Sequence, residues 1–198
     1  MTDTEIVQLV IAGNRDAFRT LAEKYQGMVF RTCMGFVHDK EDAEDLTQDV
    51  LVNVYQSLGK FKGQSSFSTW VFRIAINASL NFVRKKSRHS IFQRFETLFG
   101  FEKTNEIQQI ESVSFNPEQI LTNKERSEHI YKALDSLSEN QRIVFTLSKY
   151  DDLPQREIAQ IMNLTEGAVE ALLQRAKANL QKKLSDYYYK KTNTRRKI

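Results

Sequence analysis

Residues 153–177 read LPQREIAQIMNLTEGAVEALLQRAK, a stretch that predicts two helices joined by a very short turn. Pro154 opens the first helix, Asn163 suits the left-handed backbone of a tight turn, and Thr165 can cap the second helix. Apolar side chains recur at helical spacing in both helices, and Ala159 is small enough for a close crossing. This is the layout of a helix-turn-helix, whose second helix offers its polar face to the major groove of DNA. An ordinary helical hairpin is the alternative that this stretch leaves open.

The composition of the 198 residues excludes several classes of protein. With 40% apolar and 27% charged residues the chain is typical of a folded protein, and only 7 Gly and 2 Pro argue against an all-β or barrel fold. The single cysteine, Cys33, excludes an internal disulfide framework and indicates a reducing compartment. No apolar run approaches the roughly 18–20 residues of a membrane span, and the first residues do not resemble a signal peptide. We therefore expect a cytoplasmic protein.

Helical spacing of apolar residues recurs along nearly the whole chain, so we expect an all-α fold with two small helical domains. The expected organisation is a first domain at 1–88, a flexible linker at 89–116, a second domain at 117–185 and a basic tail at 186–198. The linker lacks a dominant apolar face, and its scattered phenylalanines are Phe92, Phe95, Phe99, Phe101 and Phe115.

Polar residues mark where several of these helices begin. Asn14 is expected to cap a helix of the first domain, and two further helices are expected to begin after Asp39 and at either Ser66 or Ser68. In the second domain, Ser138 begins a capping-box pattern. Charge is concentrated at the end of the chain, where residues 174–198 hold nine Lys or Arg and one acidic residue. Such a segment is typical of a protein that meets a polyanion, although a merely solvated tail has the same composition.

The sequence offers no catalytic constellation and no cofactor site. His38, His89 and His129 are far apart and lack a spaced cysteine or histidine partner, so we expect solvated surface histidines and no metal. Asp151 and Asp152 are explained by a turn before the next helix rather than by acid–base chemistry. Neither a phosphate-cradling glycine loop nor a nucleophile–base motif occurs. The chain is therefore expected not to be an enzyme.

Aromatic and basic residues alternate in residues 60–88. Aromatic faces stack unpaired bases and basic groups follow phosphates, so the mixture suits single-stranded nucleic acid. A purely structural role is the competing interpretation, and we expect at least two of the four aromatic side chains to lie in the core. The four are Phe61, Phe67, Trp70 and Phe72.

Three segments in order carry a resemblance to a known family. They are residues 42–50 (DAEDLTQDV), residues 61–77 (FKGQSSFSTWVFRIAIN) and the helix-turn-helix at 153–177. Together the three resemble bacterial sigma factors of the extracytoplasmic-function (ECF) class of the sigma-70 family, over nearly the whole chain. The resemblance implies a region 2 bundle and a region 4 helix-turn-helix, which bind core RNA polymerase and direct it to promoters. It also implies that the protein binds single-stranded DNA at the −10 promoter element and duplex DNA at the −35 element. Control by an anti-sigma factor is implied as well.

The resemblance implies roles for three sets of residues. The set expected to dock on core polymerase is Asp42, Asp45, Leu46, Gln48, Asp49 and Asn53. The set expected at the −10 element is Lys62, Gln64, Ser65, Ser66, Phe67, Trp70, Arg73, Asn77, Asn81, Arg84 and Lys85. The set expected at the −35 element is Gln155, Arg156, Thr165, Glu166, Gly167, Glu170, Ala171, Gln174, Arg175 and Lys177.

Two other functions compete with this interpretation. A stand-alone helix-turn-helix regulator would bind duplex operators and use residues 1–88 as a sensor or dimerisation domain. The acidic helix at 42–49 and the aromatic loop at 61–70 fit a sigma factor better. A hydrolase or transferase would need the catalytic constellation that the sequence lacks. The chain also departs from the family at Glu170 and Leu172, where members often carry lysine and arginine.

Overall fold

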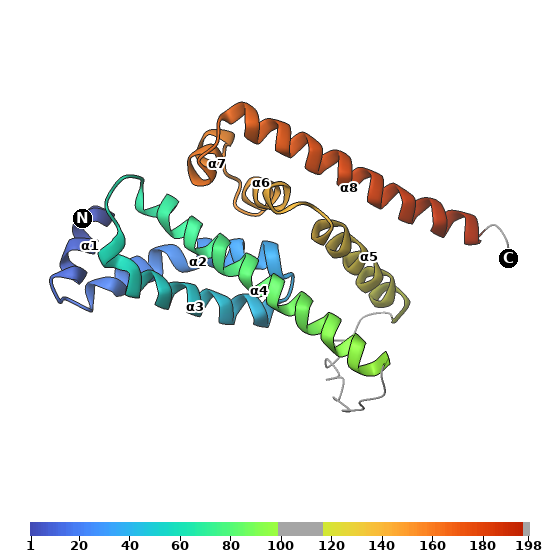
Figure 1. Ribbon diagram of the computed structural model, residues 1–198, viewed down its shortest axis with the longest axis horizontal. Helices are drawn as coiled ribbons and strands as arrows, with labels where there is room; N and C mark the ends of the chain where they lie inside the picture. The colour runs from blue at the N-terminus through green and yellow to red at the C-terminus, as the bar shows by residue number, and fades with distance from the viewer. Residues whose placement is uncertain (99–116, 196–198) are drawn as a thin grey trace. The chain divides into compact units, whose positions relative to one another are not determined.

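The computed structural model describes residues 1–98 and 117–195, and all regular structure within them is helical (Figure 1). The α-helices are α1 (Asp3–Ile11), α2 (Ala17–Val37), α3 (Lys40–Ser57), α4 (Phe67–Leu98), α5 (Pro117–Asp135), α6 (Glu139–Lys149), α7 (Gln155–Met162) and α8 (Glu166–Arg195). A short 3-10 helix, η1, covers Leu58–Lys60. The expected all-α fold is confirmed. Over the described ranges, no helix combines the length and apolarity that a bilayer crossing requires.

Most of the predicted helix starts are correct. The Asp39 carboxylate accepts from the Asp42 amide at 3.0 Å, and the Ser66 hydroxyl accepts from the Thr69 amide at 3.1 Å. The Asn14 side chain accepts from the Ala17 amide at 3.2 Å, at the start of α2. The capping box at Ser138 is wrong, because its hydroxyl makes no cap hydrogen bond although its extended backbone does begin α6. The sequence pattern located the boundary but not the side-chain rotamer.

Two helices are longer than the sequence pattern indicated. Helix α4 continues to Leu98, into the segment expected to be linker, and α8 continues to Arg195, into the expected tail. Neither extension contains a glycine or proline, so nothing in the sequence interrupts the helical hydrogen bonds. The expectations for Phe99, Phe101 and Phe115 lie outside the described residues.

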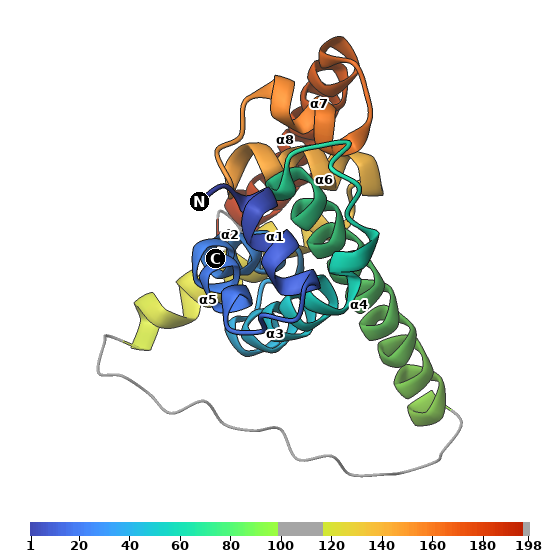
Figure 2. The ribbon, with the colours of Figure 1, turned by 90° about the vertical axis from the view of Figure 1, so that its left-hand side faces the viewer.

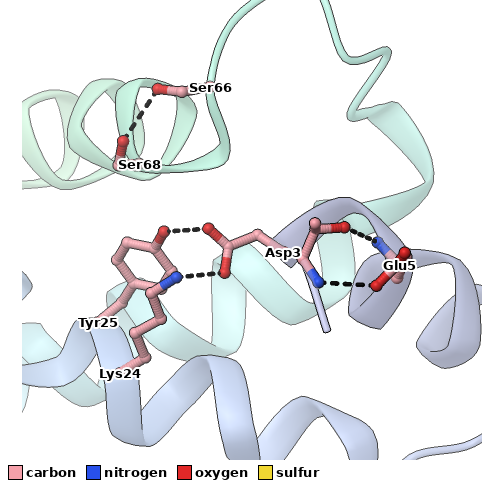
Figure 3. A network of polar contacts seen from close by, with 7 residues as sticks. Asp3, Glu5, Lys24, Tyr25, Ser66 and Ser68 are labelled. Atoms are coloured by element: carbon pink, nitrogen blue, oxygen red, sulfur yellow. Dashed lines mark hydrogen bonds and ion pairs between the residues drawn. The ribbon is translucent and has the colours of Figure 1, made fainter.

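A first apolar core holds α1, α2 and α3 against the beginning of α4 (Figure 1). Its fully buried side chains include Val7, Leu21, Val29, Val50 and Val71. The N-terminal helix is also fixed by polar contacts, which Figure 3 shows from close by. The Asp3 carboxylate accepts from Lys24 Nζ and from the Tyr25 hydroxyl, each at 2.6 Å. This core supports the loop that precedes α4.

Residues 1–83 and 138–178 form one compact unit, and the described residues of 84–137 and 179–195 form another. In the first unit a second apolar core includes residues of α2, α4, α6, α7 and α8. Phe36 of α2 and Ile76 of α4 lie in this core, with Leu147 of α6, Ile158 of α7 and Val169 of α8. The helix-turn-helix sequence is therefore packed within the first unit.

Candidate nucleic-acid interface

The turn between α7 and α8 has the geometry expected of a helix-turn-helix (Figure 2). Asn163 ends α7 with φ 56° and ψ 46°, the left-handed conformation that asparagine tolerates. The Leu164 amide donates to the Ala159 carbonyl at 2.9 Å, which closes the end of α7. The Thr165 hydroxyl then accepts from the Ala168 amide at 3.2 Å and caps α8. The predictions for Asn163 and Thr165 are both confirmed.

The outer face of α8 is available for contact. Val169 and Leu173 are buried against α7, while Glu166, Glu170, Gln174, Arg175 and Lys177 are exposed and Ala171 is half-buried. The Gln174 side-chain amide donates to Glu170 Oε1 at 3.3 Å, so the two expected base readers already face each other. Gln155, Arg156, Thr165 and Gly167 are exposed around the turn. The polar face therefore carries both signs of charge.

The aromatic loop before α4 is divided between the core and the surface. Phe67 and Phe72 are buried, whereas Phe61 and Trp70 are half-buried, so at least two of the four aromatics are core as expected. The Phe61 and Phe67 rings meet edge-on at 5.3 Å, and the Trp70 ring lies 5.6 Å from Phe67. Phe67 therefore supports the loop from beneath and offers no free face for a base.

Polar residues of the loop and of α4 differ in how far they are exposed to solvent. Lys62 and Gln64 are exposed, and so are Asn77, Asn81, Arg84 and Lys85 along α4. Ser65 is half-buried and donates to the Ser66 carbonyl at 3.3 Å. The Ser66 hydroxyl is occupied by the cap of α4 and by the Thr69 hydroxyl at 2.8 Å. The exposed members on α4 form a polar track that begins at Asn77.

Arg73 of α4 is hydrogen-bonded to another helix. Its Nε donates to the Ile161 carbonyl at 2.9 Å, and its Nη2 donates to the Gln160 carbonyl at 2.8 Å. Both carbonyls belong to the last turn of α7. Arg73 and Asn77 also line a cavity of about 220 Å³ together with Asn140 of α6 and Ile161. The guanidinium is thus well placed at the negative end of a helix dipole.

The acidic helix α3 presents one polar face. Asp45, Gln48, Asp49 and Asn53 are exposed and Asp42 is half-buried. Leu46 is only 6% exposed and packs in the first core, so it supports this face from inside. Val52 is 54% exposed and lies three, four and seven residues from exposed members of the set. The sequence did offer a signal for Val52, because this apolar residue lies outside the row of apolar positions that α3 buries.

Two electrostatic features occur where α2 meets α6. The Asp151 side chain is 1% exposed, accepts from the Thr32 hydroxyl at 2.9 Å and lies 3.7 Å from Arg31 Nε. Burial raises the pKa of the Asp151 carboxyl to about 6, against the opposing effects of Thr32 and Arg31. His38 ends α2 in the left-handed conformation, and its Nε2 lies 3.4 Å from Arg142 Nη2. The expectation of a solvated histidine is wrong for His38, because α6 places a buried arginine beside it.

Comparison with known proteins decides the family. The family model described as Sigma-70 region 2 matches residues 21–89, and Sigma-70, region 4 matches residues 127–180. The RNA polymerase sigma-H factor of Pseudomonas aeruginosa is 31% identical over 184 residues, covering 92% of this chain and 93% of the relative. The chain belongs to the sigma-70 family, in its ECF class. The ECF RNA polymerase sigma-E factor of Escherichia coli K12 is 29% identical, covering 93% of this sigma factor and 95% of the relative.

Solved structures agree on the fold. CnrH in complex with the cytosolic domain of CnrY has a TM-score of 0.63 at 21% identity, covering 93% of this chain and 97% of that one. The sigma factor RpoE in complex with the anti-sigma factor NepR from Bartonella quintana has a TM-score of 0.54 at 21% identity. It covers 85% of this sigma factor and 96% of that chain. As a sigma factor the protein directs transcription initiation by RNA polymerase, and the stand-alone regulator is not favoured.

The structure also identifies residues of this sigma factor that sequence reasoning missed. Val52 is one, and Arg142 of α6 is another, since it is 6% exposed and donates to the Phe36 carbonyl at the end of α2. The sequence around Arg142 does not indicate this contact, because its partner is more than a hundred residues away along the chain. In the described part of the chain, no group of three His, Cys, Asp or Glu side chains could hold a metal ion.

Proposed function

We propose that this sigma factor works through three surfaces: the polar face of α3, the loop at 61–66 with the exposed track of α4, and the outer face of α8. The observation that carries the proposal is the capped helix-turn-helix, whose α8 face is polar and exposed while its inner stripe is buried. The proposed domains are region 2 at 1–88 and region 4 at 117–185. The protein acts in the cytoplasm, without a cofactor and without catalytic activity of its own.

The polar face of α3 is proposed to dock on core RNA polymerase. Carboxylates of Asp45 and Asp49 provide charge at the rim, which mainly sets association rate and specificity. Val52 is exposed on the same helix, just before Asn53. It supplies an apolar centre that docking on the polymerase can bury. An apolar centre with a polar rim is the usual anatomy of a protein–protein interface.

The loop at 61–66 is proposed to receive a flipped base of the −10 element. A base must leave the stack before a protein can hold it, which costs a few kcal/mol. Gln64, which is exposed, and Ser65, which is half-buried, are proposed to supply hydrogen bonds, while the Ser66 hydroxyl caps α4. Asn77, Asn81 and Lys85 then follow the strand along α4, with spacings of four residues.

The outer face of α8 is proposed to read the −35 element from the major groove. Glu170 can accept from a cytosine amino group and Gln174 can pair with adenine, contacts that discriminate by about 1–3 kcal/mol. Arg156, Arg175 and Lys177 are proposed to hold phosphates, which position the helix without reading sequence. The sigma factor RpoE, of similar fold, is described in complex with the anti-sigma factor NepR, and we propose an anti-sigma factor for this chain as well.

Run-off transcription tests the proposal. Purified core polymerase is incubated with genomic promoter fragments, with and without the full chain, and new transcripts are mapped. Transcripts that depend on the protein support a sigma factor. Tight binding of the protein alone to duplex DNA, with no new transcripts when polymerase is present, would instead support a stand-alone regulator.

A further inference from the structure

Helix α1 precedes the segment that matches Sigma-70 region 2, yet it contacts η1, the short helix that leads into the loop at 61–66. Val7 of α1 is fully buried in the first core, so the helix is firmly attached. Where the loop begins, the Phe61 amide donates to the Leu58 carbonyl of η1 at 3.0 Å. The start of the loop is therefore fixed to an element that α1 touches.

The end of the loop is linked to α1 through Tyr25 of α2. The Asp3 carboxylate of α1 accepts from the Tyr25 hydroxyl at 2.6 Å (Figure 3). The Tyr25 ring meets the Phe67 ring edge-on, with 5.3 Å between their centroids, and both side chains are buried. Phe67 directly follows Ser66, the last residue of the loop, and begins α4. We call Asp3, Tyr25 and Phe67 the contact chain.

The hydroxyl of Tyr25 fixes the orientation of its ring. A hydrogen bond to a carboxylate is charge-assisted and stronger than one between neutral groups. Burial and the Asp3 carboxylate both raise the pKa of the Tyr25 hydroxyl, so it remains a donor at physiological pH. An edge-on aromatic pair depends on the orientation of both rings. Asp3 therefore helps to orient the ring against which Phe67 packs.

Phe67 connects the contact chain to the aromatic residues nearer the surface. Its ring lies 5.3 Å from the Phe61 ring and 5.6 Å from the Trp70 ring, and the Phe61 and Trp70 rings lie 5.4 Å apart. Phe61 and Trp70 are half-buried, so they bridge the core and the solvent. The exposed loop residues are held between Phe61 and Phe67 in the chain. A shift of Phe67 would therefore change the shape of the loop.

We propose that α1 takes part in promoter opening, because the contact chain holds the loop at 61–66 in the shape that receives a flipped base. Asp3 and Tyr25 are positioning residues, since they act through Phe67 and not by contact with DNA. The inference rests on the proposed function of the loop. The contact chain itself can be measured without promoter DNA.

Fluorescence of Trp70 is the first measurement, because this is the only tryptophan of the full chain. Tyr25→Phe removes the hydroxyl, keeps the ring and is expected to increase the quenching of Trp70 by acrylamide, since Phe67 loses its fixed support. Asp3→Ala removes the acceptor and is expected to have the same effect. Asp3→Asn keeps an oxygen acceptor and is expected to remain closer to wild type.

Two control variants separate the contact chain from a general loss of stability. Tyr55→Phe removes the same hydroxyl from a half-buried tyrosine that packs against the first core, whose ring meets Phe18 at 5.0 Å. Cys33→Ala truncates a fully buried side chain of α2, about two turns beyond Tyr25. Both are expected to leave the quenching of Trp70 as in wild type, and urea denaturation compares the stability of all variants.

Promoter opening is the second measurement. With saturating core polymerase and sigma factor, permanganate reactivity of the −10 thymines is expected to fall about threefold to tenfold in Tyr25→Phe, the factor that corresponds to one hydrogen bond. The affinity for core polymerase is expected to equal that of wild type, because the exposed face of α3 is unaltered. A general loss of folded protein would lower both quantities together.

The inference is overturned if Trp70 in Tyr25→Phe and Asp3→Ala is quenched only as much as in Tyr55→Phe. Equal quenching in Cys33→Ala at an equal loss of stability would overturn it too, and so would wild-type opening by Tyr25→Phe. If wild type itself opens no promoter, the proposed function fails, while the Trp70 measurement still decides whether the contact chain holds the loop.

Discussion

At the scale of the residue, Asp151 places a carboxyl in an environment that disfavours its charge. Its pKa is raised to about 6 from 3.8, so the folded state binds the proton more tightly than the unfolded chain. The stability that this proton contributes is present at low pH and is lost as pH rises through about 6. Asp151→Asn cannot ionise and should therefore raise the free energy of unfolding by about 1–2 kcal/mol at pH 8 but by little at pH 4.

Urea denaturation at the two pH values measures this difference. Asp152→Asn is the matched control, because Asp152 is exposed and asparagine tolerates its left-handed backbone, with φ 52°. The Asp152 charge also raises the pKa of Asp151, though less than burial does, so the control should stabilise the protein at pH 8 by less than Asp151→Asn and change little at pH 4. An Asp151→Asn effect of equal size at pH 4 and pH 8 would show that its charge is not the cause.

At the scale of the element, α3 offers the most direct test of polymerase docking. Val52→Ala should lower the affinity for core polymerase about fivefold, since the apolar area lost is worth about 1 kcal/mol. The matched control is Ile11→Ala on α1, which is 50% exposed and lies outside the docking face. Core affinity is measured by fluorescence titration, and equal effects of the two variants would remove Val52 from the interface.

Helix α8 separates two kinds of DNA contact. Arg175→Ala should weaken binding to all promoters alike and lower the salt dependence by about one counterion, as expected for a phosphate contact. Glu170→Lys should raise non-specific affinity and blur the preference at one base. Both effects are measured by transcribing, with each protein, a promoter library that is randomised at −35. Identical selections from wild type and Glu170→Lys would show that Glu170 reads nothing.

The elements also show which structural features can be read from sequence. Asn163 and Thr165 were predicted correctly because a turn and a cap act within a few residues of chain. The extensions of α4 and α8 were missed, since a segment without an apolar face stays helical when nothing breaks it. The partners of Arg73 could not be predicted, because Ile161 is 88 residues further along and backbone carbonyls carry no sequence signal.

At the scale of the whole molecule, Arg73 joins α4 to the last turn of α7, so its removal should affect stability as well as the promoter step. Arg73→Ala loses the hydrogen bonds to the Gln160 and Ile161 carbonyls and should lower the free energy of unfolding by about 1–2 kcal/mol. It also loses a cationic contact at −10, and promoter opening at saturating sigma factor should fall about fivefold to tenfold.

Two reference variants separate these effects. Lys85→Ala belongs to the exposed track of α4 and should reduce opening while leaving the free energy of unfolding unchanged. Gly35→Ala, whose Cβ would meet the Thr146 and Tyr150 side chains, should lower the free energy of unfolding while leaving opening by the folded protein unchanged. Stability is read by urea denaturation, and opening is read by permanganate reactivity of the −10 thymines. If Arg73→Ala behaved like Lys85→Ala, its contacts to α7 would carry no energy, because the loss of two contributing hydrogen bonds must lower stability as well as opening.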